Sequence, residues 1–406
     1  MKLAFVNGNI ATLQGYTLSP QRGENFGDLG LMEKGTVLVE DGYIKEVGKD
    51  LPIPSDYQII DVQGRLVTPG LIDPHTHLVH YGSREREYTW RIQGKPYMEI
   101  LKEGGGILSS VKQTRRATLE ELLKQSRKSL DRMLSMGITT VENKSGYGLN
   151  LETELKQLKA GQILNKEHPV DVINTFLGAH AIPLEYKENP DGYVEEVIKM
   201  LPIVREYAQF CDVFCEEGVF SVAQSERILL KAKEYGFKLK IHADEIVPTK
   251  GAQLAARIRC VSADHLLAVD EEGIEDLANS KTIAVLLPGT SFNLMSKKYA
   301  PAQRMIEKGV AIALATDYNP GSCPTENPQL IMTLACLNLK LTPAQALAAF
   351  TINAAHSLDL AHDRGSIEKG KIADLVIFDC DNVDYIPYHF GINHVQAVYK
   401  RGVKVC

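Results

Sequence analysis

The sequence predicts an α/β fold: a (β/α)8 TIM-type barrel with a small β-sandwich domain built from both termini. Three observations predict it, namely the length of 406 residues, the β-rich ends, and a long middle in which apolar runs alternate with helical patterns. A chain of this length holds two or three domains, or one large barrel with an appendage. We place the N-terminal part of the sandwich at 1–65, the barrel at 66–365 and the C-terminal part of the sandwich at 366–406.

Both ends of the chain read as short strands separated by Gly and Asp turns. The sequence Asp41-Gly42 between two such runs is a strong hairpin signal. Because the same pattern of short strands and turns returns after residue 365, we expect one small domain that contains both termini. The strand-like segments are 3–13, 35–48, 57–67, 365–380 and 394–405.

The middle of the chain contains eight nearly continuous apolar runs, most of which end in a polar or charged residue. Such runs are typical of strands buried on both faces of a parallel sheet. Capping signals at Thr118 with Glu121, and at Thr342-Pro343, begin helices between them. Eight β/α units favour a closed barrel over an open doubly wound sheet, and no GxGxxG follows the first strand. The runs are 71–78, 138–146, 172–180, 212–218, 239–245, 261–266, 282–289 and 311–317.

Composition narrows the class of protein. The chain has 45 Lys and Arg against 51 Asp and Glu, a net charge of −6, which argues against a nucleic-acid binder driven by bulk positive charge. Seven scattered cysteines without a CxxC pair favour a reducing compartment over a disulfide framework. The N-terminus lacks a secretory pattern, and no apolar run approaches the ~18 residues of a membrane span. We therefore expect a cytoplasmic protein without nucleic-acid or membrane partners.

Polar side chains follow the predicted barrel strands, where the chemistry of such barrels takes place. The two imidazoles of His75 and His77 point to one side of a strand, because alternate residues share a face. With His242 and Asp317 they form a set of three nitrogens and one oxygen that suits zinc or ferrous iron. We find no lysine at a lumen-facing strand end for a carbamate bridge, so one metal is favoured over two. A buried core histidine and a loop-capping carboxylate are the alternatives for His242 and Asp317.

Asp317 and two further residues at these ends suit acid–base work beside a metal, which lowers the pKa of bound water to about 7. Asp317 is placed to accept a proton from that water and pass it to a leaving nitrogen. Glu245 follows His242 by three residues and is a candidate to protonate a ring nitrogen, or else a surface carboxylate. His265 is a candidate to stabilise an oxyanion, or else a partner of a metal ligand.

Groups that suit an anionic substrate come from the loops after the strands. Arg84 is able to hold a carboxylate with two donors, although a solvated surface arginine is an equal alternative. Tyr147 lies in a Gly-rich loop at the predicted mouth, where it either reaches a ligand or packs. The turn at 319–322 predicts a nest of backbone N–H groups for an anion, and His180 ends the third strand.

Several of these stretches resemble the amidohydrolase superfamily, and more narrowly the imidazolonepropionase family. The superfamily resemblance rests on PGLIDPHTHL, KIHADE, SADHL, the Thr-Asp of the last strand and GSIEKGKIADLVIFD. One departure follows HTHLV, where this chain reads His80-Tyr81-Gly82 in place of the family's usual Phe-Gly-Gly. The narrower resemblance runs along the whole barrel, in EGGGI (103–107), SGYGL (145–149), TFLGAHAIP (175–183), DVFCE (212–216), IHADE (241–245), ADHL (263–266) and ATDYNPGSCPTEN (315–327).

The resemblance implies an activity and a set of roles. It implies hydrolytic ring opening of 4-imidazolone-5-propanoate to N-formimidoyl-L-glutamate in histidine degradation, with one zinc or iron ion and a homodimer. The implied metal ligands are His75, His77, His242 and Asp317, and the implied catalytic histidine is His265. The implied contacts to substrate or product are Arg84, Tyr147, His180, Glu245, Asn319, Gly321 and Ser322.

Two other readings stay open at this point. The spacing of His242 and Glu245 also resembles deaminases that act on nucleobase-like rings. Arg84, Tyr147 and the 319–322 turn fit a propionate tail better than an uncharged base. A binding or scaffold protein without catalysis would lack some of the metal ligands, yet all four positions are filled.

Overall fold

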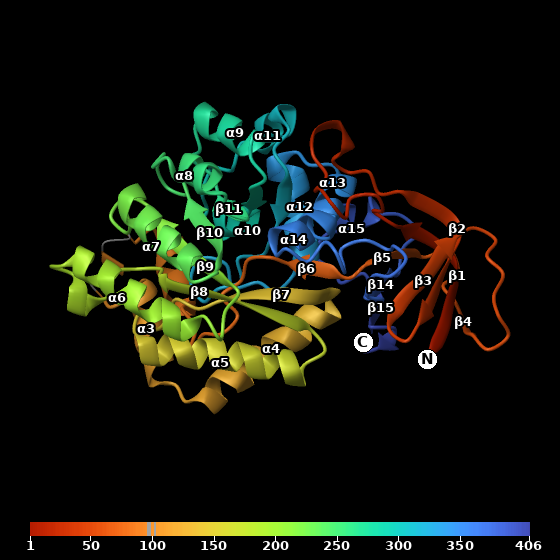
Figure 1. The fold of residues 1–406 in the computed structure, drawn as a ribbon, viewed down its shortest axis with the longest axis horizontal. Helices are drawn as coiled ribbons and strands as arrows, with labels where there is room; N and C mark the ends of the chain where they lie inside the picture. Colours follow the sequence, from red (N-terminus) through yellow and green to blue (C-terminus); the bar gives the residue numbers. More distant parts are fainter. Residues whose placement is uncertain (96–98, 101–102) are drawn as a thin grey trace.

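The computed structural model describes residues 1–95, 99–100 and 103–406, and its strands form two sheets of eight (Figure 1). One sheet is parallel and runs in chain order from β6 to β13, each strand beside the next. This order confirms the predicted (β/α)8 barrel. Its strands are β6 (Leu71–Asp73), β7 (Ile138–Lys144), β8 (Asp171–Ala179), β9 (Phe210–Cys215), β10 (Lys238–Ala243), β11 (Ser262–His265), β12 (Ile283–Leu286) and β13 (Ile312–Leu314).

The barrel closes just beyond the ends of its first and last strands. Thr76 and Tyr318 form a parallel bridge, and the His77 N–H donates to the Tyr318 carbonyl at 2.8 Å. On the other side of the bridge the Asp317 N–H donates to the His75 carbonyl at 3.0 Å. This closure brings together His75, His77 and Asp317, which are about 240 residues apart in the chain.

Helices alternate with the barrel strands and surround them (Figure 1). The predicted capping box of Thr118 with Glu121 is present before α4, and the predicted cap at Thr342 is present before α13, where Gln345 completes a second capping box. No helix among the described residues is long and apolar enough to cross a membrane. The helices are α1 (Glu85–Ile92), α3 (Ile107–Arg116), α4 (Leu119–Ser135), α5 (Leu151–Glu167), α6 (Pro190–Val204), α7 (Val222–Glu234), α8 (Gly251–Ile258), α9 (Glu271–Ala278), α10 (Pro288–Asn293), α11 (Ala302–Lys308), α12 (Pro328–Leu334), α13 (Pro343–Ala349), α14 (Ile352–Ser357) and α15 (Tyr385–Tyr388), with short turns of helix η1 (Gly23–Asn25), η2 (Leu184–Tyr186) and η3 (Ala335–Leu339).

The second sheet is mixed and contains both ends of the chain, as the sequence predicts (Figure 1). Asp41 and Gly42 both have positive φ, 50° and 87°, and make the tight hairpin between β2 and β3. The segment β5 pairs with β1 and β14, so this sheet extends past the proposed boundary at residue 65 and the barrel strands begin at Leu71. Its strands are β1 (Lys2–Ala11), β2 (Leu31–Glu40), β3 (Tyr43–Gly48), β4 (Gln58–Asp61), β5 (Leu66–Pro69), β14 (Leu375–Phe378), β15 (Val395–Lys400) and β16 (Val403–Lys404).

A cluster of charged side chains joins this sheet to the base of the barrel. Asp171, the first residue of β8, accepts from Arg364 Nη1 at 2.6 Å and from Lys400 Nζ at 2.7 Å. Lys400 also pairs with Asp374, and Arg364 Nη1 donates to Thr140 Oγ1 at 2.9 Å. The cluster holds the C-terminal strands against the end of the barrel opposite the predicted site.

Candidate active site

Three imidazoles meet at the carboxyl ends of the barrel strands. His75 and His77 follow β6 and His242 lies in β10, and one ring nitrogen from each lies within 4.8 Å of the others. All three residues are buried. The Nε2 atoms of His75 and His242 have no hydrogen-bond partner among the described residues. Because buried polar atoms are nearly always paired in folded proteins, this unpaired cluster fits a divalent metal ion.

Asp317 completes the group from the other side of the barrel closure. Its Oδ1 lies 3.5 Å from His75 Nε2 and 3.6 Å from His77 Nε2, and its Oδ2 accepts from the hydroxyl of Thr290. Burial raises the pKa of Asp317 to about 6, against the lowering effect of the Thr290 hydrogen bond. Its backbone is left-handed, with φ at 53°, a strained conformation that recurs at functional sites.

Two carboxylates orient the histidines from below. His75 Nδ1 donates to Asp264 Oδ2 at 2.6 Å, and His242 Nδ1 donates to Asp212 Oδ1 at 3.2 Å. Such bonds fix the tautomer and the ring orientation, so that Nε2 is left to bind metal. Sequence reasoning missed both carboxylates. The available signal was an Asp inside an otherwise apolar buried strand, in β9 and in β11.

The expectation that no lysine ends a lumen-facing strand is wrong. Lys144 ends β7 and is fully buried, with Nζ 2.6 Å from Asp212 Oδ2, 3.2 Å from Glu142 Oε2 and 3.3 Å from Asp264 Oδ2. Burial lowers the pKa of Lys144, but these three carboxylates outweigh it and raise the pKa above its usual value. A carbamate needs the neutral amine, so the one-metal interpretation now depends on this ammonium staying charged.

Two aromatic side chains form one wall of the site. His180 stacks on His77, with the ring centroids 4.8 Å apart and the planes 9° apart. Its Nδ1 donates to the Gly146 carbonyl at 3.0 Å, and burial lowers the pKa of His180 to about 3, so the ring is neutral. The Tyr147 ring lies 5.4 Å from His180 and 5.7 Å from His77. Glu154 holds the loop of Tyr147 in place, since its carboxylate accepts from three backbone N–H groups between 146 and 149.

The departure from the family pattern at His80 is accommodated as packing. His80 is buried, and its Nδ1 donates to the carbonyl of His77 at 2.8 Å. Its ring lies 5.5 Å from Tyr318 and 6.1 Å from Tyr147. Burial lowers the pKa of His80 to about 4. The imidazole is therefore a neutral ring that supports the loop before Arg84.

Glu245 and His265 lie side by side at the ends of β10 and β11. Glu245 Oε1 is 3.6 Å from His265 Nδ1, a buried atom without a hydrogen-bond partner among the described residues. Burial raises the pKa of Glu245 to about 8, and the charge of Asp317 adds to the rise. Burial lowers the pKa of His265 well below its usual value. The pair therefore consists of a carboxylic acid and a neutral imidazole at pH 7. Glu216 fixes their loop by accepting from the Ile246 N–H at 2.8 Å.

Two of the three guanidinium nitrogens of Arg84 are paired with a neighbouring carboxylate. Its Nε and Nη2 donate to the Glu87 carboxylate at 3.0 and 2.7 Å. The Gly106 N–H donates to the same carboxylate at 3.1 Å. The remaining nitrogen, Nη1, lies so close to Gly321 that a Cβ atom there would approach it to 2.0 Å. The structure thus brings Arg84 against the turn at 319–322, and only glycine permits that approach.

The predicted nest of backbone N–H groups at 319–322 is filled by the chain itself. The N–H groups of Gly321 and Ser322 both donate to Asn319 Oδ1 at 2.8 Å. The Asn319 amide in turn donates to the Asp317 carbonyl at 2.7 Å and to Ser322 Oγ at 2.8 Å. The side chain of Asn319 therefore closes the turn locally, which spacing along the sequence does not reveal. An anion at this turn meets the Arg84 guanidinium and the Ser322 hydroxyl instead of free N–H groups.

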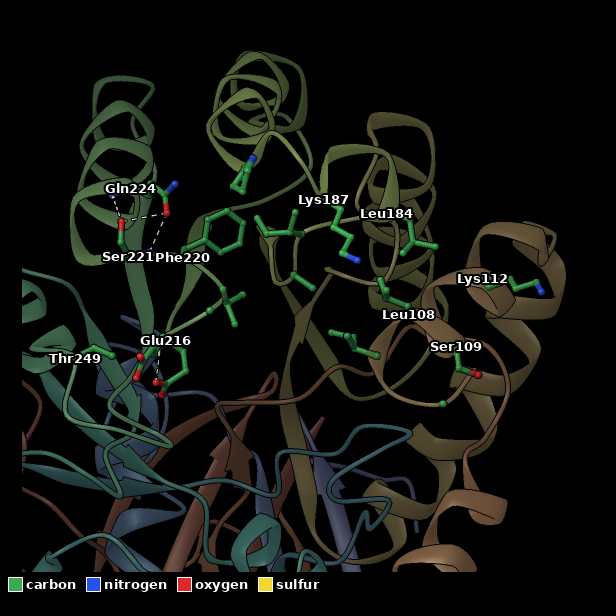
Figure 2. Close-up of a pocket in the computed structure, with 18 of the residues that line it drawn as sticks. Leu108, Ser109, Lys112, Leu184, Lys187, Glu216, Phe220, Ser221, Gln224 and Thr249 are labelled. Atoms are coloured by element: carbon green, nitrogen blue, oxygen red, sulfur yellow. Dashed lines mark hydrogen bonds between the residues drawn. The ribbon is translucent and has the colours of Figure 1, made fainter. Parts of the chain in front are cut away.

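A cavity of about 1700 Å³ opens beside these residues. Figure 2 shows Glu216 and Phe220 on one side of it, with Leu108, Leu184 and Lys187 opposite. Its lining includes Glu216 and Ala181, the neighbour of His180, so the cavity adjoins the site without containing the histidine cluster.

Comparison with known proteins identifies the family. A model of the "Amidohydrolase family" matches residues 66–405. An imidazolonepropionase from Alkaliphilus oremlandii is 56% identical over 402 residues, 97% of this chain and 95% of that protein. One from Brevibacillus brevis is 53% identical over 406 residues, 98% of this chain and 96% of that protein. The chain belongs to the imidazolonepropionase family of amidohydrolases.

Solved structures support the fold of this imidazolonepropionase-family chain. A 5-methylcytosine deaminase from Klebsiella pneumoniae has a TM-score of 0.75, covering 100% of this chain and 98% of its own, at 17% identity. A guanine deaminase from C. acetobutylicum has a TM-score of 0.70 at 14% identity, covering 100% of both chains. At these identities the likeness concerns the fold alone, whereas the family assignment depends on the relatives above 50% identity.

Proposed function

We propose that this family member hydrolyses 4-imidazolone-5-propanoate to N-formimidoyl-L-glutamate, by adding water across a ring carbon–nitrogen bond. The observation that carries the proposal is the buried cluster of His75, His77 and His242 with its unpaired nitrogens. Arg84 lies against the 319–322 turn that follows Asp317. The relatives named imidazolonepropionase, at 52–56% identity, support the choice of substrate. An imidazolone ring places the scissile bond at the cluster while its propionate reaches toward a cation.

One divalent metal ion, zinc or iron, would be held by His75, His77, His242 and Asp317. The unpaired Nε2 atoms and the nearby Asp317 carboxylate suit either ion. When bound, the ion supplies Lewis-acid chemistry and lowers the pKa of water at the site. Asp212 and Asp264 hold the rings of His242 and His75 in the orientation that this binding needs.

Proton transfer is assigned to Asp317, Glu245 and His265. Asp317, with its pKa raised to about 6, accepts the proton of the attacking water and returns it to the leaving ring nitrogen. Glu245 is protonated at pH 7 and donates a hydrogen bond to a ring nitrogen of the substrate. His265 stays neutral and directs its ring at the carbonyl oxygen, where negative charge develops. Because Glu245 and His265 are adjacent, they contact neighbouring polar atoms of one small ring.

Substrate contacts are assigned to the wall and the turn around these acids. The propionate is held by Arg84, whose guanidinium Glu87 aligns toward the 319–322 turn. Tyr147 and His180 lie against the imidazolone ring, and Asn319, Gly321 and Ser322 contact the product. A deaminase acting on an uncharged base is the second candidate, and such a base has no carboxylate that the Arg84 guanidinium could bind.

The location and assembly of the protein also stay proposals. We propose that it is a cytoplasmic homodimer, and that its domains divide near residue 70, a few residues after the boundary expected at 65, and near residue 366. Exposed apolar side chains at Tyr388, Phe390 and Ile392 are compatible with an interface between copies. Sedimentation equilibrium of the purified protein tests this assembly, and a monomer at micromolar concentration contradicts it.

The decisive experiment uses freshly made 4-imidazolone-5-propanoate. We expect its ultraviolet absorbance to fall and formimidoylglutamate to appear, with no turnover of the control substrates cytosine and guanine. A chelator should abolish the reaction, and zinc or ferrous iron should restore it. Full activity of the metal-stripped protein, or faster turnover of either nucleobase, would contradict the proposal.

A further inference from the structure

Lys144 lies beneath the histidine cluster and contacts both carboxylates that orient it. Its Nζ is 2.6 Å from Asp212 Oδ2, and Asp212 holds His242. The same Nζ is 3.3 Å from Asp264 Oδ2, and this oxygen also accepts from His75 Nδ1 at 2.6 Å. One ammonium therefore lies between the supports of two metal-binding rings that come from different strands.

A second buried lysine in the same layer shows that this placement is specific. Lys240 is as fully buried as Lys144, and its Nζ donates to Glu142 Oε2 at 2.9 Å and to the Pro74 carbonyl at 3.1 Å. Among the described residues, its hydrogen-bond and ion-pair partners do not include the carboxylates of Asp212 or Asp264. The two lysines thus match in burial and in their contact with Glu142, but only Lys144 bridges the supports of the histidines.

The electrostatics of this layer explain why a bridge is needed. Asp212 and Asp264 are both fully buried carboxylates, and each accepts a hydrogen bond from one imidazole of the cluster. The Lys144 ammonium lies 2.6 Å from one carboxylate and 3.3 Å from the other, so it offsets the repulsion between them. Removing that ammonium leaves two buried anions without the partner they share, and their repulsion moves them apart. This movement shifts a ring that Asp212 or Asp264 holds.

We propose that Lys144 is a positioning residue of the metal centre, which sets the orientation of His75 and His242 through Asp264 and Asp212. The inference rests on the proposed metal site and adds a residue that touches neither metal nor substrate. A positioning role differs from that of an ion pair that only stabilises the fold, because loss of Lys144 must then change how the folded protein binds metal. Lys240 provides the matched control, because its loss perturbs the same layer without touching these supports.

The test measures metal binding to the full-length protein, stripped of metal and kept under reducing conditions. Zinc affinity of the wild type, Lys144→Met, Lys144→Gln and Lys240→Met is determined by competition with a chromophoric chelator. We expect both Lys144 variants to bind zinc roughly 10- to 100-fold more weakly, the range typical of lost outer contacts to metal ligands. We expect Lys240→Met to stay within about 3-fold of the wild type.

Visible spectra of the cobalt-loaded proteins give a second measurement, which a change in folding stability alone does not alter. The spectrum reports ligand geometry, and it should change in Lys144→Gln while Lys240→Met keeps the wild-type bands. Lys144→Gln is close in size to lysine, so it serves if the Met variant does not fold. Wild-type affinity and spectrum in a folded Lys144 variant, or equal losses at Lys144 and Lys240, would overturn the inference. A wild-type protein that binds no metal would instead remove the proposed metal centre itself.

Discussion

The two ends of the barrel both bury charged and polar groups, but they treat them differently. At the base, Asp171 is paired with Arg364 and Lys400, and Lys400 is paired again with Asp374. At the mouth, ring nitrogens of the histidine cluster and Nδ1 of His265 are buried without partners among the described residues. Unpaired buried nitrogens are costly, whereas a completed network adds rigidity. The comparison teaches that the base holds the two sheets together and that the mouth is kept ready for a ligand.

Some residues at the mouth also have an unusual backbone conformation. Asp244, His265, Leu266 and Asp317 have positive φ, as do other non-glycine residues elsewhere in the described chain. Such conformations cost of order 1–3 kcal/mol each and persist where the surroundings impose them. The surroundings here include the Asp244 carboxylate, which accepts from the backbone of 249–252, and the closure bonds at Asp317.

The largest effect should follow from a change at the mouth. His242→Asn removes the proposed metal-binding Nε2, while its amide nitrogen takes the place of Nδ1 and can still donate to Asp212. We expect kcat/KM to fall about 10³-fold or more, because the site loses its metal chemistry. The unfolding free energy of the metal-free protein should change by less than about 1 kcal/mol, because the Nε2 atom has no partner to lose. Chemical denaturation measures this free energy. A loss as large as that of a core substitution would contradict the difference between the mouth and the base.

The next effect concerns the acid at the mouth. Glu245→Gln should lower kcat about 100-fold, because a neutral amide does not protonate a ring nitrogen. The pKa of Glu245 is raised to about 8 and that of Asp317 to about 6, so the wild-type rate should be highest between these two values and fall as pH rises through about 8. A kcat–pH profile of the variant should lose this alkaline limb. Persistence of the same limb in Glu245→Gln would assign it to another group.

A change at the base should reverse the pattern of effects. Asp171→Ala removes the partner of Arg364 and Lys400, and we expect a loss of about 2 kcal/mol of unfolding free energy, or roughly 30-fold in the equilibrium. kcat should stay within about twofold of the wild type, since the base does not touch the site. A large loss of kcat in a folded Asp171→Ala protein would contradict the division between the two ends.

The pH dependence of stability sharpens the same point. Burial acts to raise the pKa of Asp171, but Lys400 and Arg364 outweigh it and lower the pKa below its usual value. A carboxylate with a depressed folded pKa stabilises the fold above its unfolded pKa, near 4, and loses this effect as pH falls below that value. We expect the wild type to lose more stability below pH 4 than Asp171→Ala does. Unfolding free energies are measured by denaturation from pH 6 to 3. An equal loss in the two proteins would contradict this expectation.

The smallest effect is expected at the edge of the site. Arg84→Lys keeps a positive charge but loses the paired contact with Glu87 and the flat approach to Gly321. We expect KM for the imidazolone substrate to rise about tenfold with kcat changed less than threefold, because a point charge holds the carboxylate less well. Steady-state kinetics measure both constants. An unchanged KM would remove Arg84 from the substrate site.

Local pattern was enough for the strands of the barrel and much of the proposed metal site. The predicted runs 71–78, 239–245 and 261–266 each contain a barrel strand, because burial on both faces demands continuous apolar sequence. The spacing of His75 and His77 correctly placed both rings together, since strand geometry alternates locally. The hairpin at Asp41-Gly42 and the capping boxes are local too, and they are confirmed.

What sequence reasoning missed depends on partners from distant strands. Lys144 was overlooked because nothing near it in the sequence explains a buried lysine. Its partners Asp212 and Asp264 come from other strands. The pairing of Arg84 with Glu87 and the filling of the 319–322 turn by Asn319 required side-chain directions that no spacing supplies.

The amino-acid sequence by itself determined which segments become barrel strands and which residues lie at their carboxyl ends. It did so because hydrophobic periodicity and turn chemistry act between residues close in the chain. Only the tertiary structure decided which of those residues are paired and which are left open to a ligand. Barrel closure places Asp317 against His75, and strand register places one ammonium between two carboxylates. Those placements depend on strand tilt and pairing across the whole barrel, over separations at which local pattern carries no information.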